Sequence, residues 1–177
     1  MGLVAIALGI GGTGYYAAFL IIILHSLAKS SLFYQMGQLS RILNTFRLDN
    51  CGKYMALYPA GALVLIAGLI TIMAIPPSGL FISELMIFRA MVNNNQWIAL
   101  VIVILLLSFI LYAMSIRIMH IVYSNPRRDF DPGPPSYVNP VETVSQFFLL
   151  GLVVVFCFYQ PWFIADLINQ SIAIFLP

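Results

Sequence analysis

His25 and Lys29 are the first candidates for a functional site. They are four residues apart, so on a helix their side chains share one face. They follow the uncharged stretch YYAAFLIIIL, residues 15–24. A charge near the centre of a bilayer costs about 2.5–3.5 kcal/mol on insertion scales. Burial disfavours the charged form of lysine, and histidine titrates near neutral pH, so the pair could relay protons. The alternative, that both side chains reach out to the membrane surface, remains open at this point.

Glu84 is the second candidate, because it is the only acidic residue between Lys53 and Arg89. It follows IPPSG, residues 75–79, and therefore falls in the first turns of the helix expected after that segment. Loss of water favours the protonated carboxyl group, whereas a helix N-terminus favours the carboxylate. A group under both influences could load and unload a proton. Helix capping at a surface, or an ion pair with Arg89, is the alternative.

Arg117 and His120 stand near the end of the helix expected over 97–123. Anchoring at the membrane interface is one interpretation of this pair, and a secondary part in proton transfer is the other. Asp166 has the same expected position at an interface.

The composition places these residues in an integral membrane protein. Of the 177 residues 62% are hydrophobic and 8% are charged, whereas soluble domains carry about 25% charged residues. The net charge of +2 gives no reason to expect a nucleic-acid partner. Cys51 and Cys157 match no metal-ligand spacing. GIGGTG, residues 9–14, lacks the flanking strand of a dinucleotide site, and neither G-x-S-x-G nor HExxH occurs. We therefore expect no cofactor or metal bound by this chain.

We expect membrane-spanning helices to carry these candidates. Such a helix needs about 20 apolar residues to cross the bilayer once. Pro76, Pro77 and Gly79 predict a helix break, because proline removes a backbone donor and restricts the residue before it. Residues 2–8 are too short to cross and end at the glycines of GIGGTG. The expected helices cover about 15–36, 54–75, 97–123 and 143–165, with a half-length helix over 80–92 and polar loops over 37–53 and 124–140. The predicted fold is all-α: one polytopic transmembrane domain, residues 1–177, with four full helices and one discontinuous helix.

Two motifs resemble the antiporter-like subunits of respiratory complex I. The first resembles H-A-x-x-K-x-x-L-F-x-x-x-G and stands here as His25, Lys29, Leu32, Phe33 and Gly37, with serine in place of the alanine. The second resembles P-P-x-x-G/F-x-x-E or K, and stands here as Pro76, Pro77, Gly79, Phe81, Ser83 and Glu84. The same family serves membrane-bound [NiFe] hydrogenases of the hydrogenase-4 and formate hydrogenlyase types, and multisubunit Na⁺/H⁺ antiporters. The wording ISELMIF after PPSGLF is most similar to the hydrogenase and complex I members.

The resemblance implies a proton-translocating subunit of a redox-driven complex, either an NADH dehydrogenase (quinone) or a hydrogenase. Lys29 would be the central relay lysine, His25 its neighbour on a hydrated axis, and Glu84 the terminal carboxylate that exchanges protons at one membrane face. Such subunits hold no redox centre and are driven by electron transfer in their neighbours.

The resemblance covers only one of the two inverted repeats that family members contain, the C-terminal one. It therefore implies a fragment, a split gene, or a separate chain that supplies the N-terminal repeat. The implied partners are other membrane subunits and the lipid bilayer, in a bacterial or archaeal cytoplasmic membrane. A structural membrane subunit and a component of a multisubunit Na⁺/H⁺ antiporter are the competing interpretations.

Overall fold

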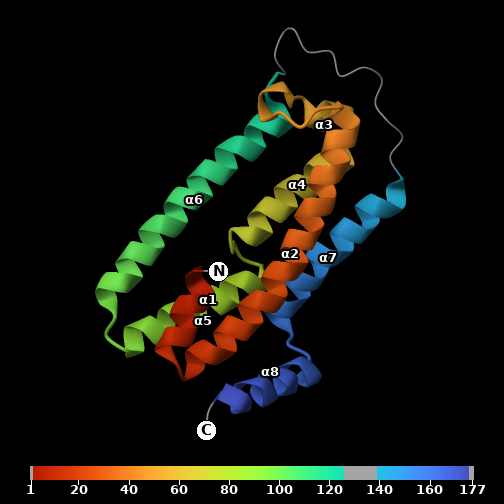
Figure 1. The fold of residues 1–177 in the computed structure, drawn as a ribbon. Coiled ribbons are helices and arrows are strands. Elements are labelled where there is room, and N and C mark those ends of the chain that lie inside the picture. Colours follow the sequence, from red (N-terminus) through yellow and green to blue (C-terminus); the bar gives the residue numbers. More distant parts are fainter. Residues whose placement is uncertain (1, 126–138, 176–177) are drawn as a thin grey trace.

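The computed structural model describes residues 2–125 and 139–175, and every regular element in this part of the chain is helical (Figure 1). This confirms the all-α fold class. Most of the loop predicted over 124–140 lies outside the described residues. In chain order the elements are α1 (Gly2–Ile10), α2 (Thr13–Leu43), η1 (Leu48–Asn50), α3 (Tyr54–Leu57), α4 (Pro59–Ile72), α5 (Gly79–Asn93), α6 (Trp97–Tyr123), α7 (Pro140–Phe158) and α8 (Trp162–Phe175).

The long helix α2 is the centre of the molecule and packs against α1, α4, α5, α7 and α8. It continues seven residues beyond the expected end at Met36. Buried Leu39 and Ile42 extend the inward face of the helix, so apolar packing carries it through the polar residues around position 37. Asn44, in the left-handed region with φ 48°, ends it.

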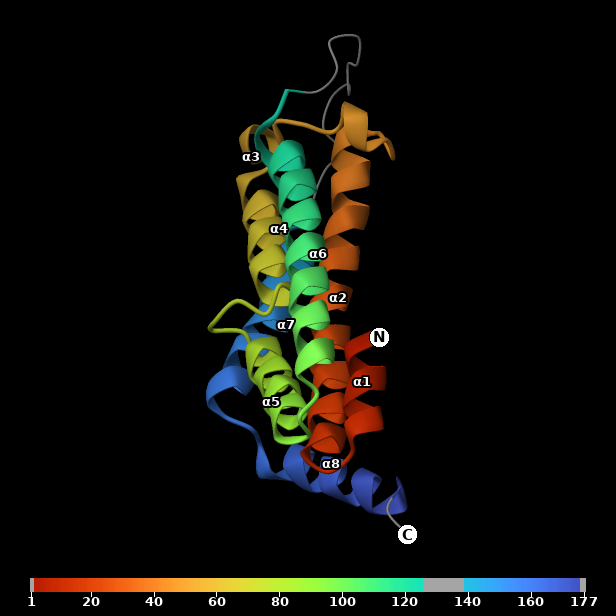
Figure 2. The same cartoon turned by 90° about the vertical axis from the view of Figure 1, so that its left-hand side faces the viewer.

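The glycines at positions 11 and 12 make the turn between α1 and α2. Their φ angles are +74° and +54°, a backbone region that suits glycine. Gly14 then lies so close to the backbone of Ala7 that there is no room for a β-carbon. The two helices therefore form a tight antiparallel hairpin (Figure 2).

The helix expected over 54–75 is divided in the structure. Tyr58 leaves helical geometry at φ −148°, because the residue before Pro59 is disfavoured in a helix. The second part, α4, has 14 residues and ends at Ile72 rather than at residue 75. Ala74 follows with a φ of +51°.

The chain is non-helical from residue 73 to residue 78, across the two prolines where the sequence predicts a break. Ser78 joins the two sides of this break. Its Oγ accepts a hydrogen bond from the backbone N–H of Leu80 at 3.2 Å, which caps α5. The same hydroxyl donates to the carbonyl of Thr71 in α4 at 3.1 Å. As a result α4 and α5 follow one another along the bundle (Figures 1 and 2).

Beyond the break, α6 has the bounds expected from the sequence, whereas the helix expected over 143–165 is interrupted. Pro161 disfavours helix at the preceding residue, and α8 begins at Trp162 and crosses one end of the bundle (Figures 1 and 2). Within the described residues, α2, α6 and α7 are the helices long and apolar enough to cross a membrane. Residues 2–125 and 139–175 thus contain three full-length helices of this kind, where the sequence predicts four.

Two apolar clusters hold the helices together. One joins α1, α2, α5 and α7 around Leu24, Ile87 and Val153. The other joins the end of α2 to α3, α4 and the end of α6 around Leu43, Leu65 and Val122.

Candidate functional site

His25 and Lys29 lie one turn apart near the middle of α2. The imidazole is half-buried and the Lys29 side chain is exposed. Lys29 lies 16 residues after Thr13 and 14 residues before Leu43. At about 1.5 Å per residue, the ends of α2 are roughly 24 and 21 Å away. A lysine side chain cannot cover either distance, so Lys29 does not reach an end of its own helix.

Glu84 lies in the second turn of α5 and is half-buried. Ser78, and not Glu84, caps the helix. Among the described residues, Glu84 makes no hydrogen bond and no ion pair, with Arg89 or with any other side chain. Glu84 therefore has neither of the two structural roles that the sequence leaves open, since it neither caps the helix nor pairs with Arg89 among the described residues.

The helix break and the pair on α2 are brought together at Gly79. A β-carbon there would lie 3.0 Å from Leu24 Cδ1 and 2.8 Å from the carbonyl oxygen of Val153. Leu24 directly precedes His25, so α5 begins at the level of the histidine. Glu84 follows about one and a half turns later, on a helix that packs along α2. In the described part of the chain, no hydrogen bond joins Glu84 to His25 or Lys29.

Arg117 and His120 are exposed and lie in the last two turns of α6. This end of α6 lies beside α3 (Figure 1), where the backbone N–H of Lys53 donates to the carbonyl of Ser124 at 2.7 Å. The structure does not bring the two side chains together with the pair on α2. Their anchoring or secondary role stays a prediction.

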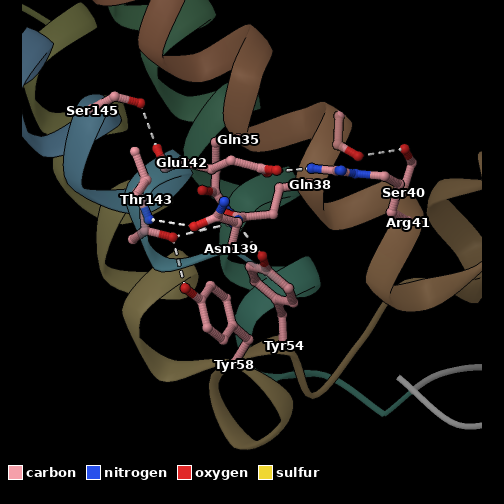
Figure 3. Close-up of polar contacts among 12 residues, drawn as sticks. Gln35, Gln38, Ser40, Arg41, Tyr54, Tyr58, Asn139, Glu142, Thr143 and Ser145 are labelled. Carbon is pink, nitrogen blue, oxygen red and sulfur yellow. Dashed lines mark hydrogen bonds and ion pairs between the residues drawn. The ribbon is translucent and has the colours of Figure 1, made fainter. Parts of the chain in front are cut away.

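A buried polar cluster between α2, α3 and α7 was not predicted. Gln35 Nε2 donates to the Tyr54 hydroxyl at 2.7 Å, and Gln38 Nε2 donates to Thr143 Oγ1 at 3.1 Å. The Tyr58 hydroxyl lies 2.6 Å from the same Thr143 oxygen (Figure 3). The cluster, hereafter the glutamine cluster, consists of Ser31, Gln35, Gln38, Tyr54, Tyr58, Thr143 and Gln146.

Helical spacing on α2 is a partial sequence signal of this cluster, although it does not give the partners on α3 and α7. Ser31, Gln35 and Gln38 recur every three or four residues. Ser31 and Gln38 contact α7, whereas Gln35 contacts Tyr54 of α3. All three are fully buried, at 0% exposure. Ser31 and Gln35 fall in the helix expected over 15–36 and Gln38 in the loop expected over 37–53, and their uncharged side chains did not mark them as candidates.

A groove runs between α2 and α7 beside the glutamine cluster. Arg41 of α2 forms an ion pair with Glu142 in the first turn of α7, and both side chains are partly exposed (Figure 3). The residues that line the groove are Phe33, Tyr34, Gly37, Arg41, Glu142, Ser145 and Gln146. Gln146 therefore belongs to both the groove and the cluster.

No group of three or more His, Cys, Asp or Glu side chains within the described ranges could hold a metal ion. That this chain itself binds no cofactor stays a prediction.

Comparison with known proteins gives two findings. Residues 1–110 match the family model described as "NADH:quinone oxidoreductase/Mrp antiporter, TM". The chain is also 28% identical over 133 residues to a protein named Hydrogenase-4 component F homolog, from Methylacidiphilum infernorum (isolate V4). The aligned region is 75% of this chain and 28% of that relative. The family match covers α2 with its histidine–lysine pair and α4–α5 with Glu84. Together with its long apolar helices, this match shows that the chain is a multi-pass membrane protein that belongs to the NADH:quinone oxidoreductase/Mrp antiporter transmembrane family.

Proposed function

We propose that this chain is a proton-translocating, antiporter-like membrane subunit of a redox-driven complex, of the NADH:quinone oxidoreductase or membrane-bound hydrogenase type. Lys29 is the central relay group, His25 is its neighbour, and Glu84 exchanges protons with one face of the membrane. The observation that carries the proposal is the family match over residues 1–110, which includes all three residues.

The position of Lys29 supports this role. An ionisable side chain in the middle of an apolar helix is costly in lipid, and such residues usually face protein or a water-filled cavity. Because Lys29 is exposed on α2, we infer that another membrane segment or a hydrated space covers this side of the helix. A separate chain that supplies a second repeat is one such segment.

Electrostatic coupling gives the mechanism. Two unit charges 4 Å apart interact by about 4 kcal/mol at an effective dielectric constant of 20. That is roughly three pKa units, so a charge change on one group can load or release a proton on the next. Electron transfer in neighbouring subunits supplies the driving charge change.

The name of the relative supports a set of partner subunits, since it is called a component of hydrogenase-4. The family description also includes Mrp antiporters, which favours a second candidate: a component of a multisubunit Na⁺/H⁺ antiporter. The two differ in whether ion movement requires electron transfer.

Purification of the chain from its native membranes in mild detergent tests the proposal. Iron–sulfur or flavin proteins are expected to co-purify. In vesicles, Lys29→Ala and Glu84→Gln are expected to stop redox-driven proton movement while the complex still assembles. Arg89→Gln, on the exposed side of α5, is the matched control. A complex without redox proteins would favour the antiporter, and normal pumping by both relay variants would contradict the proposal.

A further inference from the structure

We propose that the glutamine cluster is a buried binding site for water, filled through the groove between α2 and α7. The site lies inside the helix bundle, among the last turns of α2 and the first turns of α7. It is separate from the histidine–lysine pair and from Glu84.

Unpartnered polar atoms point to a bound ligand. Gln35 Oε1, Gln38 Oε1 and both amide atoms of Gln146 are buried and have no hydrogen-bond partner in the protein. All three side chains are at 0% exposure. A buried polar group without a partner is costly, and native proteins satisfy such groups with ordered water. Four such atoms on three side chains of one cluster indicate more than a single defect in packing.

The chemical types of the unpartnered atoms favour water over a cation as the ligand. A cation could bind the amide oxygens, but it would leave the Nε2 group of Gln146 without an acceptor. Water both donates and accepts, so it satisfies the nitrogen and the oxygens together. A polar site with two to four protein partners is also the kind that retains buried water.

The groove supplies the route. Gln146 is among the residues that line the groove although its side chain is 0% exposed, and Arg41 and Glu142 stand at the exposed part of the groove. Figure 3 shows these two charged residues beside Gln38 and Thr143.

The site also deepens the proposed function, and this step rests on it. Ser31 Oγ donates to the carbonyl of Gln146 at 3.1 Å, so the polar interior extends to a level two residues from Lys29. Water held there would bring protons to the level of the relay from the membrane face that carries α3.

Cysteine labelling tests the site without any measurement of transport. In a full-length chain that lacks Cys51 and Cys157, Gln146→Cys is compared with Val153→Cys. These two positions lie two turns apart on α7 and are both at 0% exposure. Only Val153 belongs to an apolar cluster. Membranes are treated with a small charged methanethiosulfonate reagent from either side, and labelling is followed by intact mass.

Access governs thiol labelling, so Gln146→Cys is expected to react at least about tenfold faster than Val153→Cys, and from one side of the membrane. Equal rates at the two positions would overturn the proposal. If Gln146→Cys does not assemble, Gln38→Cys replaces it, with the same expected and contradicting outcomes. A labelled Gln146→Cys together with normal pumping by Lys29→Ala would refute the proposed function and leave the water site standing.

Discussion

Gly79, the first residue of α5, lies directly against Leu24, the residue before His25. A β-carbon at Gly79 would be 3.0 Å from Leu24 Cδ1 and 2.8 Å from the backbone oxygen of Val153. Three helices therefore meet where the discontinuous helix resumes. This contact fixes the position of Glu84 along the bundle relative to His25 and Lys29 on α2.

Gly79→Ala is expected to destabilise the protein. The added methyl group meets a backbone oxygen that cannot rotate away, and overpacking of this kind costs about 1–3 kcal/mol. Thermal unfolding in detergent measures the loss. Gly151→Ala, on α7 with no atom within 4 Å of its β-carbon position, is the control and should not be destabilised. Equal loss in both variants would contradict the close packing.

Gly61→Ala and Gly68→Ala, seven residues apart on α4, should differ in the same assay. At Gly61 the methyl group would meet Tyr54 Oη at 2.5 Å and Gln35 Nε2 at 2.8 Å, and these two atoms are hydrogen-bonded to each other. At Gly68 it would meet the flexible end of Leu32. We expect a loss of about 1–3 kcal/mol for Gly61→Ala and a smaller one for Gly68→Ala. The reverse order would show that the glutamine cluster is not tightly held.

The Arg41–Glu142 ion pair is expected to contribute little stability. Its side chains are 57% and 37% exposed, and exposed pairs are typically worth about 0–1 kcal/mol. A double-mutant cycle with Arg41→Gln and Glu142→Gln, again by unfolding in detergent, measures the coupling. A much larger coupling would mean that the pair is shielded from water in the membrane.

Cys51, in the segment before α3, should react slowly with thiol reagents. Its side chain is 2% exposed and its Sγ lies 3.3 Å from the carbonyl of Arg47. Burial raises the pKa of the Cys51 thiol, so the reactive thiolate forms at higher pH than in free cysteine. With Cys157 replaced by serine, the labelling rate should increase at a higher pH than it does for free cysteine. A profile that matches free cysteine would contradict this burial.

The sequence predicts those parts of the fold that depend on long apolar runs and strong helix breakers. The bounds of α6 follow from 27 residues with few charges, and the gap before α5 follows from Pro76 and Pro77. The effect of single prolines within apolar stretches was harder to predict. Pro59 and Pro161 each end helical geometry inside a stretch that looked long enough to cross a membrane.

Features that depend on tertiary contacts could not be predicted. The extension of α2 to Leu43 depends on packing of its inward face, and polar residues around position 37 conceal this in the sequence. The glutamine cluster depends on α3 and α7 meeting that same face, residues far apart along the chain. By contrast His25, Lys29 and Glu84 stand out because charge is rare in this sequence.

A comparison of two variants in α2 tests whether Lys29 carries protons. Lys29→Ala and Ser30→Ala change neighbouring exposed residues of α2, and protons moved per electron transferred are measured in sealed vesicles that contain the whole complex. Loss of a positioned proton-transfer group typically costs about 10²-fold or more. Lys29→Ala is expected to abolish proton movement while electron transfer and assembly persist, and Ser30→Ala is expected to pump normally. Equal proton yields in the two variants would contradict it.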